Sequence, residues 1–175
     1  MMRNISIAVL GVAGLAIHTS ANAQTVIGTI DSTIELTAAC EVNGSTGTNG
    51  VDFGTLDFGS HSTFFTQATT QLQSGAGNTI EIRCSPGADA TLTFASGNND
   101  GEVNGSGRAM AFNAHFVPYD IYSDAGFQNV LDNDATIPVT ADGTMQDIPI
   151  YGRALGASGL VAGTYTDTIS VTLGF

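Results

Sequence analysis

The sequence predicts an all-β sandwich. Apolar and polar residues alternate with a period of two in several short segments, most clearly in residues 26–36, 79–84 and 164–175. This period is typical of strands with one buried face, and no segment shows the 3.6-residue period of a helix over a dozen residues. Seven or more short strands separated by turn-rich stretches indicate a sandwich. No tandem repeat or linker divides the chain, so we expect one domain.

Residues 1–23 have the features of a secretory signal peptide. Arg3 supplies the charged start, residues 5–17 the apolar core, and Ala21-Asn22-Ala23 the cleavage site. The apolar run is shorter than the roughly 20 residues that a membrane-spanning helix needs. We therefore expect an exported protein whose mature chain begins at Gln24.

The first strand of the mature chain is expected within residues 24–36. Its apolar face carries Val26, Ile30, Ile34 and Leu36, together with the small residues Gly28 and Ser32, whereas Thr29, Asp31, Thr33 and Glu35 lie on the other face. A strand at the end of a chain can pair within its own domain or leave it and complete a neighbour. The pattern alone allows both.

The later strands are also short, and each carries an apolar face. We expect them at residues 38–42, 64–72, 79–84, 90–94, 108–122, 136–140, 147–151 and 164–175. Residues 108–122 hold one long strand or two short ones, and Pro118 predicts a bulge or an edge position there. Residues 53–59 contain two aromatic-Gly pairs, which predict a bent edge segment with close backbone approach. Turns or loops are expected at residues 43–50, 98–107, 141–143 and 155–163.

The charge of the chain excludes several classes of partner. After removal of Arg3, three basic residues remain against 16 acidic ones, which gives a net charge near −13. A surface of this kind offers no cations to displace the counterions of nucleic acid, and binding to an anionic membrane surface is equally disfavoured. The charge keeps folded monomers soluble and apart, so any assembly requires specific contacts.

Two cysteines, Cys40 and Cys84, remain in the exported chain. Export places them in an oxidising compartment, so a disulfide is the expected state and a metal-binding pair the alternative. Closing a loop of about 44 residues stabilises a fold by roughly 4 kcal/mol in the chain-entropy model.

Motifs for catalysis are weak. Asp52-Phe53-Gly54 and Asp57-Phe58-Gly59 each spell the magnesium motif of kinases, but a kinase also requires a lysine and this chain has none. No Gly-x-Ser-x-Gly elbow, GxGxxG fingerprint or phosphate loop is present. A glycosidase would require two carboxylates that converge in a cleft.

Metal sites are also not indicated. His61 and His115 have no further histidine or cysteine at ligand spacing. Asp100-x-Glu102-x-Asn104-Gly105 resembles the start of a calcium loop, but Ala111 stands where that loop needs a bidentate Glu. We expect a polar turn there, no metal and no cofactor.

The last strand reaches the end of the sequence with its apolar face intact. Its inward residues are Tyr165, Ile169, Val171, Leu173 and Phe175. An immunoglobulin-like sandwich that lacks its last strand would leave a groove beside this edge, which is an aggregation hazard. A strand added from another chain can fill such a groove through backbone hydrogen bonds and alternate side chains.

Several separated motifs resemble the spore coat U domain family and, within it, the archaic chaperone–usher pilins such as the Csu pilus major subunit. They are Val26-x-Gly28-x-Ile30 before Cys40, Phe53-Gly54-Thr55-Leu56-x-Phe58-Gly59, Ile80 to Cys84, Val117-x-Tyr119-x-Ile121-Tyr122-x-Asp124-Ala125, Ile148-Pro149-Ile150-Tyr151-Gly152 and Gly163-x-Tyr165-x-Asp167-x-Ile169-x-Val171. Together they cover essentially the whole mature chain.

The resemblance implies an incomplete immunoglobulin-like sandwich, with residues 24–36 as a donor-strand extension and residues 37–175 as the pilin domain. It implies that a periplasmic chaperone stabilises the subunit, that an outer-membrane usher exports it, and that neighbouring copies exchange donor strands. The donor would present Val26, Gly28, Ile30, Ser32, Ile34 and Leu36 to a groove lined by Tyr165, Ile169, Val171, Leu173 and Phe175. Small Gly28 and Ser32 occupy two inward positions and leave the register open.

We therefore predict a non-catalytic subunit of a cell-surface pilus for attachment and biofilm formation. The first alternative is a secreted carbohydrate-binding module, or a coat or tip adhesion module. The second is a secreted hydrolase, which would need a cleft with convergent titratable groups.

Overall fold

The computed structural model describes residues 24–75, 77–103 and 107–175, so the expected signal peptide at residues 1–23 lies outside the described part. The chain divides into two units between Glu35 and Leu36. Residues 24–39 carry no strand. Ten strands follow, and within the described ranges no helix is long and apolar enough to cross a membrane.

One three-stranded sheet contains the disulfide. β1 (Cys40–Val42) and β8 (Gln146–Ile148) pair antiparallel with the two sides of β3 (Ile80–Cys84). Cys40 stands opposite Cys84 in the register, and their sulfur atoms are bonded. The expected disulfide is therefore confirmed.

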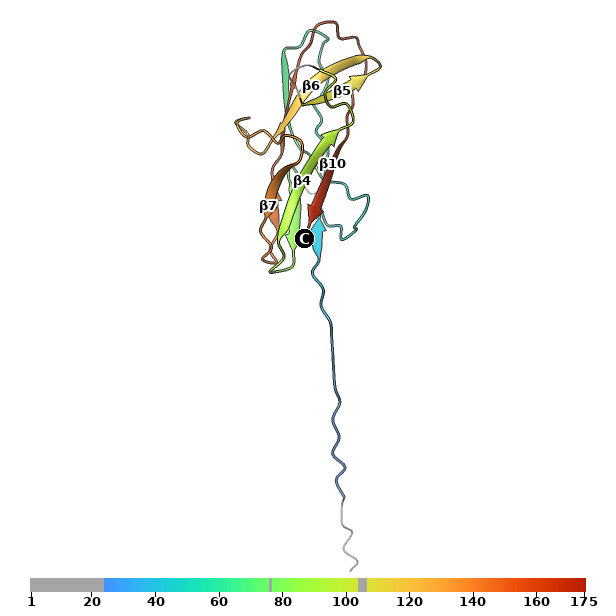
Figure 1. Cartoon of the computed structure of the whole chain (residues 1–175), viewed down its shortest axis with the longest axis vertical. Coiled ribbons are helices and arrows are strands. Elements are labelled where there is room, and N and C mark those ends of the chain that lie inside the picture. The colour runs from blue at the N-terminus through green and yellow to red at the C-terminus, as the bar shows by residue number, and fades with distance from the viewer. Residues whose placement is uncertain (1–23, 76, 104–106) are drawn as a thin grey trace, which may run out of the picture. The chain divides into compact units, whose positions relative to one another are not determined.

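A second three-stranded sheet carries the last strand. It runs in the order β10 (Ile169–Gly174), β4 (Ala90–Gly97) and β7 (Ala135–Val139), and both pairings are antiparallel. Figure 1 shows β10 beside β4, with the carboxyl terminus at the end of β10. A register shift between Ile169 and Val171 interrupts the pairing with β4.

The third sheet has four antiparallel strands in the order β2 (Gln67–Gln71), β9 (Tyr151–Leu155), β6 (His115–Tyr122) and β5 (Arg108–Phe112). β5 and β6 form a hairpin, which settles that residues 108–122 hold two strands.

One core joins the three sheets. Alternate residues of the strands are buried in it, including Ile80, Ile82, Leu92, Phe94, Val117, Ile121, Ile148 and Ala154. The predicted all-β class, with an open sheet edge, is confirmed because every element in the described part is a strand, turn or loop.

Several expectations about individual strands are wrong. Residues 24–36, where the first strand is expected, carry none, and the last strand begins at Ile169 and not at residue 164. The strand expected at residues 147–151 is divided between β8 and β9, which belong to different sheets. Pro149, which cannot donate a backbone hydrogen bond, stands where the chain crosses between them. β9 then extends into the loop expected at residues 155–163 and ends at Leu155.

Pro118 lies neither in an edge strand nor at a bulge. β6 has neighbours on both sides, and its register with β5 is regular through the Ala109–Pro118 pair. The pairing with β9 begins only at Tyr119. The missing N–H of Pro118 therefore costs no hydrogen bond to β9, which explains why an interior strand accepts it.

Candidate functional site

β10 presents an unpaired edge. It is the first strand of its sheet, and β4 occupies only one of its sides. Along β10 the burial alternates, with Ile169, Val171 and Leu173 half-buried against the core and Ser170 and Thr172 exposed. Unpaired backbone groups on this edge can bond to another strand.

Residues 51–58 form the opposite wall of a cleft beside this edge. The two Asp-Phe-Gly triplets make two turns, in which Asp52 Oδ1 accepts from the Gly54 N–H and Asp57 Oδ1 from the Gly59 N–H, each at 2.8 Å. The turns leave Phe53 and Phe58 half-buried and packed against the core. These triplets therefore shape an apolar wall.

Gly54 is required for this wall. Its φ of 122° disfavours other residues. A Cβ there would lie 2.6 Å from Leu72 Cδ2 and 2.8 Å from the Gln73 carbonyl oxygen. The approach allows Thr55 to exchange two backbone hydrogen bonds with Gln73, at 2.7 and 2.8 Å, which fixes the wall to the chain after β2. The close backbone approach expected at residues 53–59 is thus present at Gly54.

The cleft between β10 and residues 51–58, hereafter the edge groove, has a volume of about 610 Å³. Its β10 wall comprises residues 165–171, and core side chains form its floor: Leu72, Ile80, Phe94, Met110, Tyr119, Ile121 and Ile150. The edge groove therefore opens directly onto the apolar core.

A second cleft of about 500 Å³ continues from the first. Leu56, Phe58, Met110 and Tyr165 line both clefts. The second cleft then follows residues 57–63 on one side and residues 160–165 on the other. Together the two clefts follow residues 160–171, so they line the first three residues of β10 and continue along the chain that precedes it.

A half-buried polar contact lies in the edge groove. The Tyr119 hydroxyl donates to Asp167 Oδ2 at 2.7 Å, and both residues line the groove. Burial raises the pKa of Tyr119 above its ordinary value of 10.0, and the hydrogen bond to the Asp167 carboxylate raises it further. Tyr119 therefore remains protonated and donates at all physiological pH values.

The extension exposes its apolar face. Val26, Ile30 and Ile34 are 96, 95 and 84% exposed, and Leu36 is 83% exposed. Gly28 and Ser32 are exposed as well. Exposure of these four large apolar side chains to water is unfavourable, since the burial of each would contribute about 1.5–3 kcal/mol of favourable free energy.

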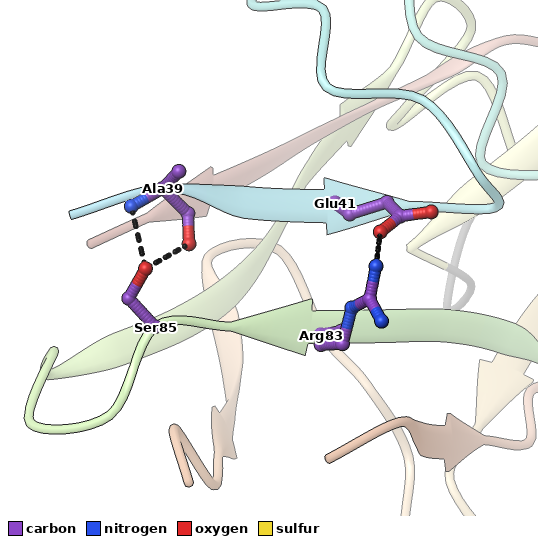
Figure 2. A network of polar contacts seen from close by, with 4 residues as sticks. All are labelled: Ala39, Glu41, Arg83 and Ser85. Atoms are coloured by element: carbon purple, nitrogen blue, oxygen red, sulfur yellow. Dashed lines mark hydrogen bonds and ion pairs between the residues drawn. The ribbon is translucent and has the colours of Figure 1, made fainter. Parts of the chain in front are cut away.

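The root of the extension is held firmly. Ser85 Oγ accepts from the Ala39 N–H at 3.0 Å and donates to the Ala39 carbonyl at 3.1 Å, and Arg83 forms an ion pair with Glu41 (Figure 2). With the disulfide, these contacts fasten β1 to β3 although β1 has only three residues.

Only some of the predicted groove residues line the edge groove. Tyr165, Ile169 and Val171 line the edge groove, Leu173 is half-buried against the core, and Phe175 is 56% exposed. Sequence reasoning missed the opposite wall and Asp167. The paired Asp-Phe-Gly triplets were the available signal for the wall.

The remaining candidate residues do not converge. His61 Nε2 lies 2.7 Å from the Phe58 carbonyl oxygen, and no group of three or more His, Cys, Asp or Glu side chains among the described residues could hold a metal ion. Asp100 Oδ1 accepts from the Gly97 N–H and its Oδ2 from Asn133 Nδ2. Asn104 and Gly105 of the calcium-like pattern lie outside the described residues.

Comparisons with known proteins identify the family. No curated protein matches the chain. Among solved structures, the chain is similar to a chain of the chaperone–tip adhesion subunit pre-assembly complex (CsuC–CsuE) from archaic chaperone–usher Csu pili of Acinetobacter baumannii, with 22% identity and a TM-score of 0.46. The match covers 79% of this chain and 40% of that one. The family model of the Spore Coat Protein U domain matches residues 26–172. The chain therefore belongs to the Spore Coat Protein U domain family.

Proposed function

We propose that this protein is a structural subunit of a cell-surface pilus that polymerises by donor-strand complementation. Residues 24–36 of one subunit insert into the edge groove of the next, between β10 and residues 51–58. The observation that carries the proposal is the pairing of an apolar groove beside an unpaired strand with an exposed, alternating apolar extension in the same chain.

The extension is longer than β10. An extended strand advances about 3.4 Å per residue, so the 11 residues from Val26 to Leu36 reach about 37 Å. The six residues of β10 span about 20 Å at the same rise. The inserted strand therefore also occupies the second cleft, which continues the edge groove beyond β10.

Two terms favour insertion of the extension. Burial of Val26, Ile30, Ile34 and Leu36 gives roughly 6–12 kcal/mol, and backbone pairing along β10 adds hydrogen bonds of about 0.5–1.5 kcal/mol each. These terms compete with the 4–15 kcal/mol that association costs in lost freedom. A strand supplies both apolar burial and backbone pairing, which supports a strand as the partner.

Before insertion the edge of β10 is a hazard for aggregation. A periplasmic chaperone covers it with a strand of its own, and an outer-membrane usher then transfers the subunit to the growing fibre. The subunit is structural and not catalytic, and the fibre serves attachment and biofilm formation.

The experiment compares two substitutions of the same kind on opposite faces of the extension. Ile30→Asn removes an apolar side chain from the inserted face and places an amide in the groove, at a cost of about 3–5 kcal/mol. Ile27→Asn makes the same change on the face that carries Thr29 and Asp31. We expect Ile30→Asn to abolish fibres in electron micrographs and Ile27→Asn to retain them.

Two further chains complete the test. Deletion of residues 24–36 should abolish fibres, whereas the same segment appended after Phe175 should give a stable monomer that fills its own groove. Normal fibres from the truncated chain, or equal effects of the two Asn substitutions, would refute the mechanism.

A further inference from the structure

The chain changes sheets just before β10. Thr166 pairs with Ala111, a residue of β5, through two backbone hydrogen bonds of 2.9 and 3.1 Å. Three residues later, Ile169 stands opposite Gly97 at the end of β4. Residues 166–169 therefore leave one sheet and join the other, and their position decides where the free edge of β10 begins.

Asp167 lies in this crossing (residues 166–169) and joins it to the rest of the domain by hydrogen bonds. Its Oδ2 accepts from the Tyr119 hydroxyl at 2.7 Å. Its Oδ1 accepts from the Asn98 N–H at 2.9 Å and from Asn99 Nδ2 at 3.0 Å. Hydrogen bonds to a carboxylate are stronger than those between neutral groups, so one side chain fastens the crossing to β6 and to the turn after β4.

Gly97 leaves room for the carboxylate. A Cβ at this position would lie 2.2 Å from Asp167 Oδ2 and 2.8 Å from Asp100 Oδ1. No side chain could be accommodated without displacing Asp167. The glycine at the end of β4 is therefore part of the same arrangement.

We propose that Asp167 is a positioning residue for strand acceptance, because its ties to Tyr119, Asn98 and Asn99 fix where β10 begins and so set the width at which the edge groove stays open. The Tyr119 ring in turn packs edge-on against Phe58 of the opposite wall, with 6.0 Å between the ring centroids. This inference rests on the proposed function. Apolar walls that face water attract one another, so the two sides of an unfilled groove tend to collapse. The ties oppose that collapse on the side of β10.

Both oxygens of Asp167 are engaged with its own domain. In this proposal the residue acts by placing β10, because its three hydrogen bonds all go to its own domain. Its loss lowers the fraction of subunits with an open groove, which slows insertion. Once a strand fills the groove, that strand holds the walls apart without the hydrogen bonds of Asp167. The rate at which the strand dissociates should therefore change little.

The test measures binding of a fluorescent peptide of residues 24–36, in excess, to the purified mature chain. Fluorescence anisotropy gives the association rate, and competition with unlabelled peptide gives the dissociation rate. For Asp167→Ala we expect an association rate lower by about tenfold or more, the population change for losing hydrogen bonds to a charged group. The dissociation rate should stay within about twofold of wild type.

Three variants sharpen the comparison. The association rate of Asp167→Asn should lie between those of Asp167→Ala and wild type, since the amide oxygen still accepts from the Asn98 N–H. Tyr119→Phe removes a single hydroxyl, and should slow association even if Asp167→Ala fails to fold. Asp142→Asn is the matched control, because Asp142 accepts from the Thr144 N–H and hydroxyl in a turn and lines neither cleft.

The outcomes separate the two proposals. A wild-type chain that does not bind the peptide contradicts donor-strand complementation itself. A wild-type chain that binds, with Tyr119→Phe and every folded Asp167 variant associating at the wild-type rate, overturns the positioning role alone. A dissociation rate that rises as much as the association rate falls also overturns it, since that result describes an ordinary loss of stability.

Discussion

Removal of the Cys40–Cys84 disulfide tests how β1, the strand at the root of the extension, is held in the domain. The bond joins residues 44 positions apart, and closing a loop of that length stabilises the fold by about 4 kcal/mol. Domains of this size are stable by only about 5–15 kcal/mol. The double variant Cys40→Ala/Cys84→Ala should therefore lose a quarter or more of the free energy of unfolding.

The other contacts of β1 are weaker. Glu41 and Arg83 are 21 and 52% exposed, so their ion pair contributes at most about 1 kcal/mol. The hydrogen bonds between Ser85 and Ala39 contribute about 0.5–1.5 kcal/mol each. We expect Glu41→Gln, which removes the charge of the pair, to cost less than about 1 kcal/mol.

Urea unfolding provides the measurement. The chain with residues 24–36 appended after Phe175 is the suitable background, because its stability does not depend on the concentration of a partner. Reduction of this chain should reproduce the effect of the double variant. A loss below about 1 kcal/mol for the double variant, or a loss from Glu41→Gln that equals it, would refute this ranking of the contacts.

Two further predictions concern the groove, and both use the same background. Stability should fall as pH rises above 10, because the unfolded chain then releases the Tyr119 proton while the folded chain, whose Tyr119 pKa is raised, retains it. Tyr119→Phe should lessen this loss in urea titrations at pH 8 to 11, and an unchanged slope would contradict it. Gly54→Ala should destabilise by about 2–4 kcal/mol, since its Cβ meets Leu72 and the Gln73 carbonyl at a positive φ. An equilibrium unfolding curve that matches wild type would show that the wall is not fixed there.

The sequence was most informative where one face of a strand is buried. β3 was predicted almost to the residue and β4 from its first residue, although β4 continues three residues beyond Phe94. Ile80, Ile82, Leu92 and Phe94 alternate with polar residues and are buried to 2% exposure or less. The disulfide followed from export and from the presence of two cysteines.

β9 was missed for a physical reason. Its inward positions hold Gly152 and Ala154, which do not resemble the apolar face of a strand. A Cβ at Gly152 would lie 2.8 Å from Phe58 Cζ, so a small residue is needed where the wall of residues 51–58 crosses the sheet. Such a requirement arises from a distant segment, and local alternation cannot reveal it.

The start of β10 was placed too early for a similar reason. Tyr165 continues the alternation of the last strand, but Thr166 pairs with β5 and only Ile169 reaches β4. Alternation with a period of two continues through a change of sheet, so sequence shows the strand face and not the sheet to which each residue belongs. The groove itself depends on tertiary contacts of Asp167, Tyr119 and residues 51–58.

The central claim is that the groove of one subunit holds the extension of another. A cryo-electron microscopy structure of the assembled fibre tests it most directly. We predict that residues 26–36 of each subunit lie as a strand between β10 and residues 51–58 of its neighbour, with Ile30 and Ile34 directed into the core. A fibre in which each extension lies in its own groove, or in which subunits meet only through outer surfaces, would contradict the claim.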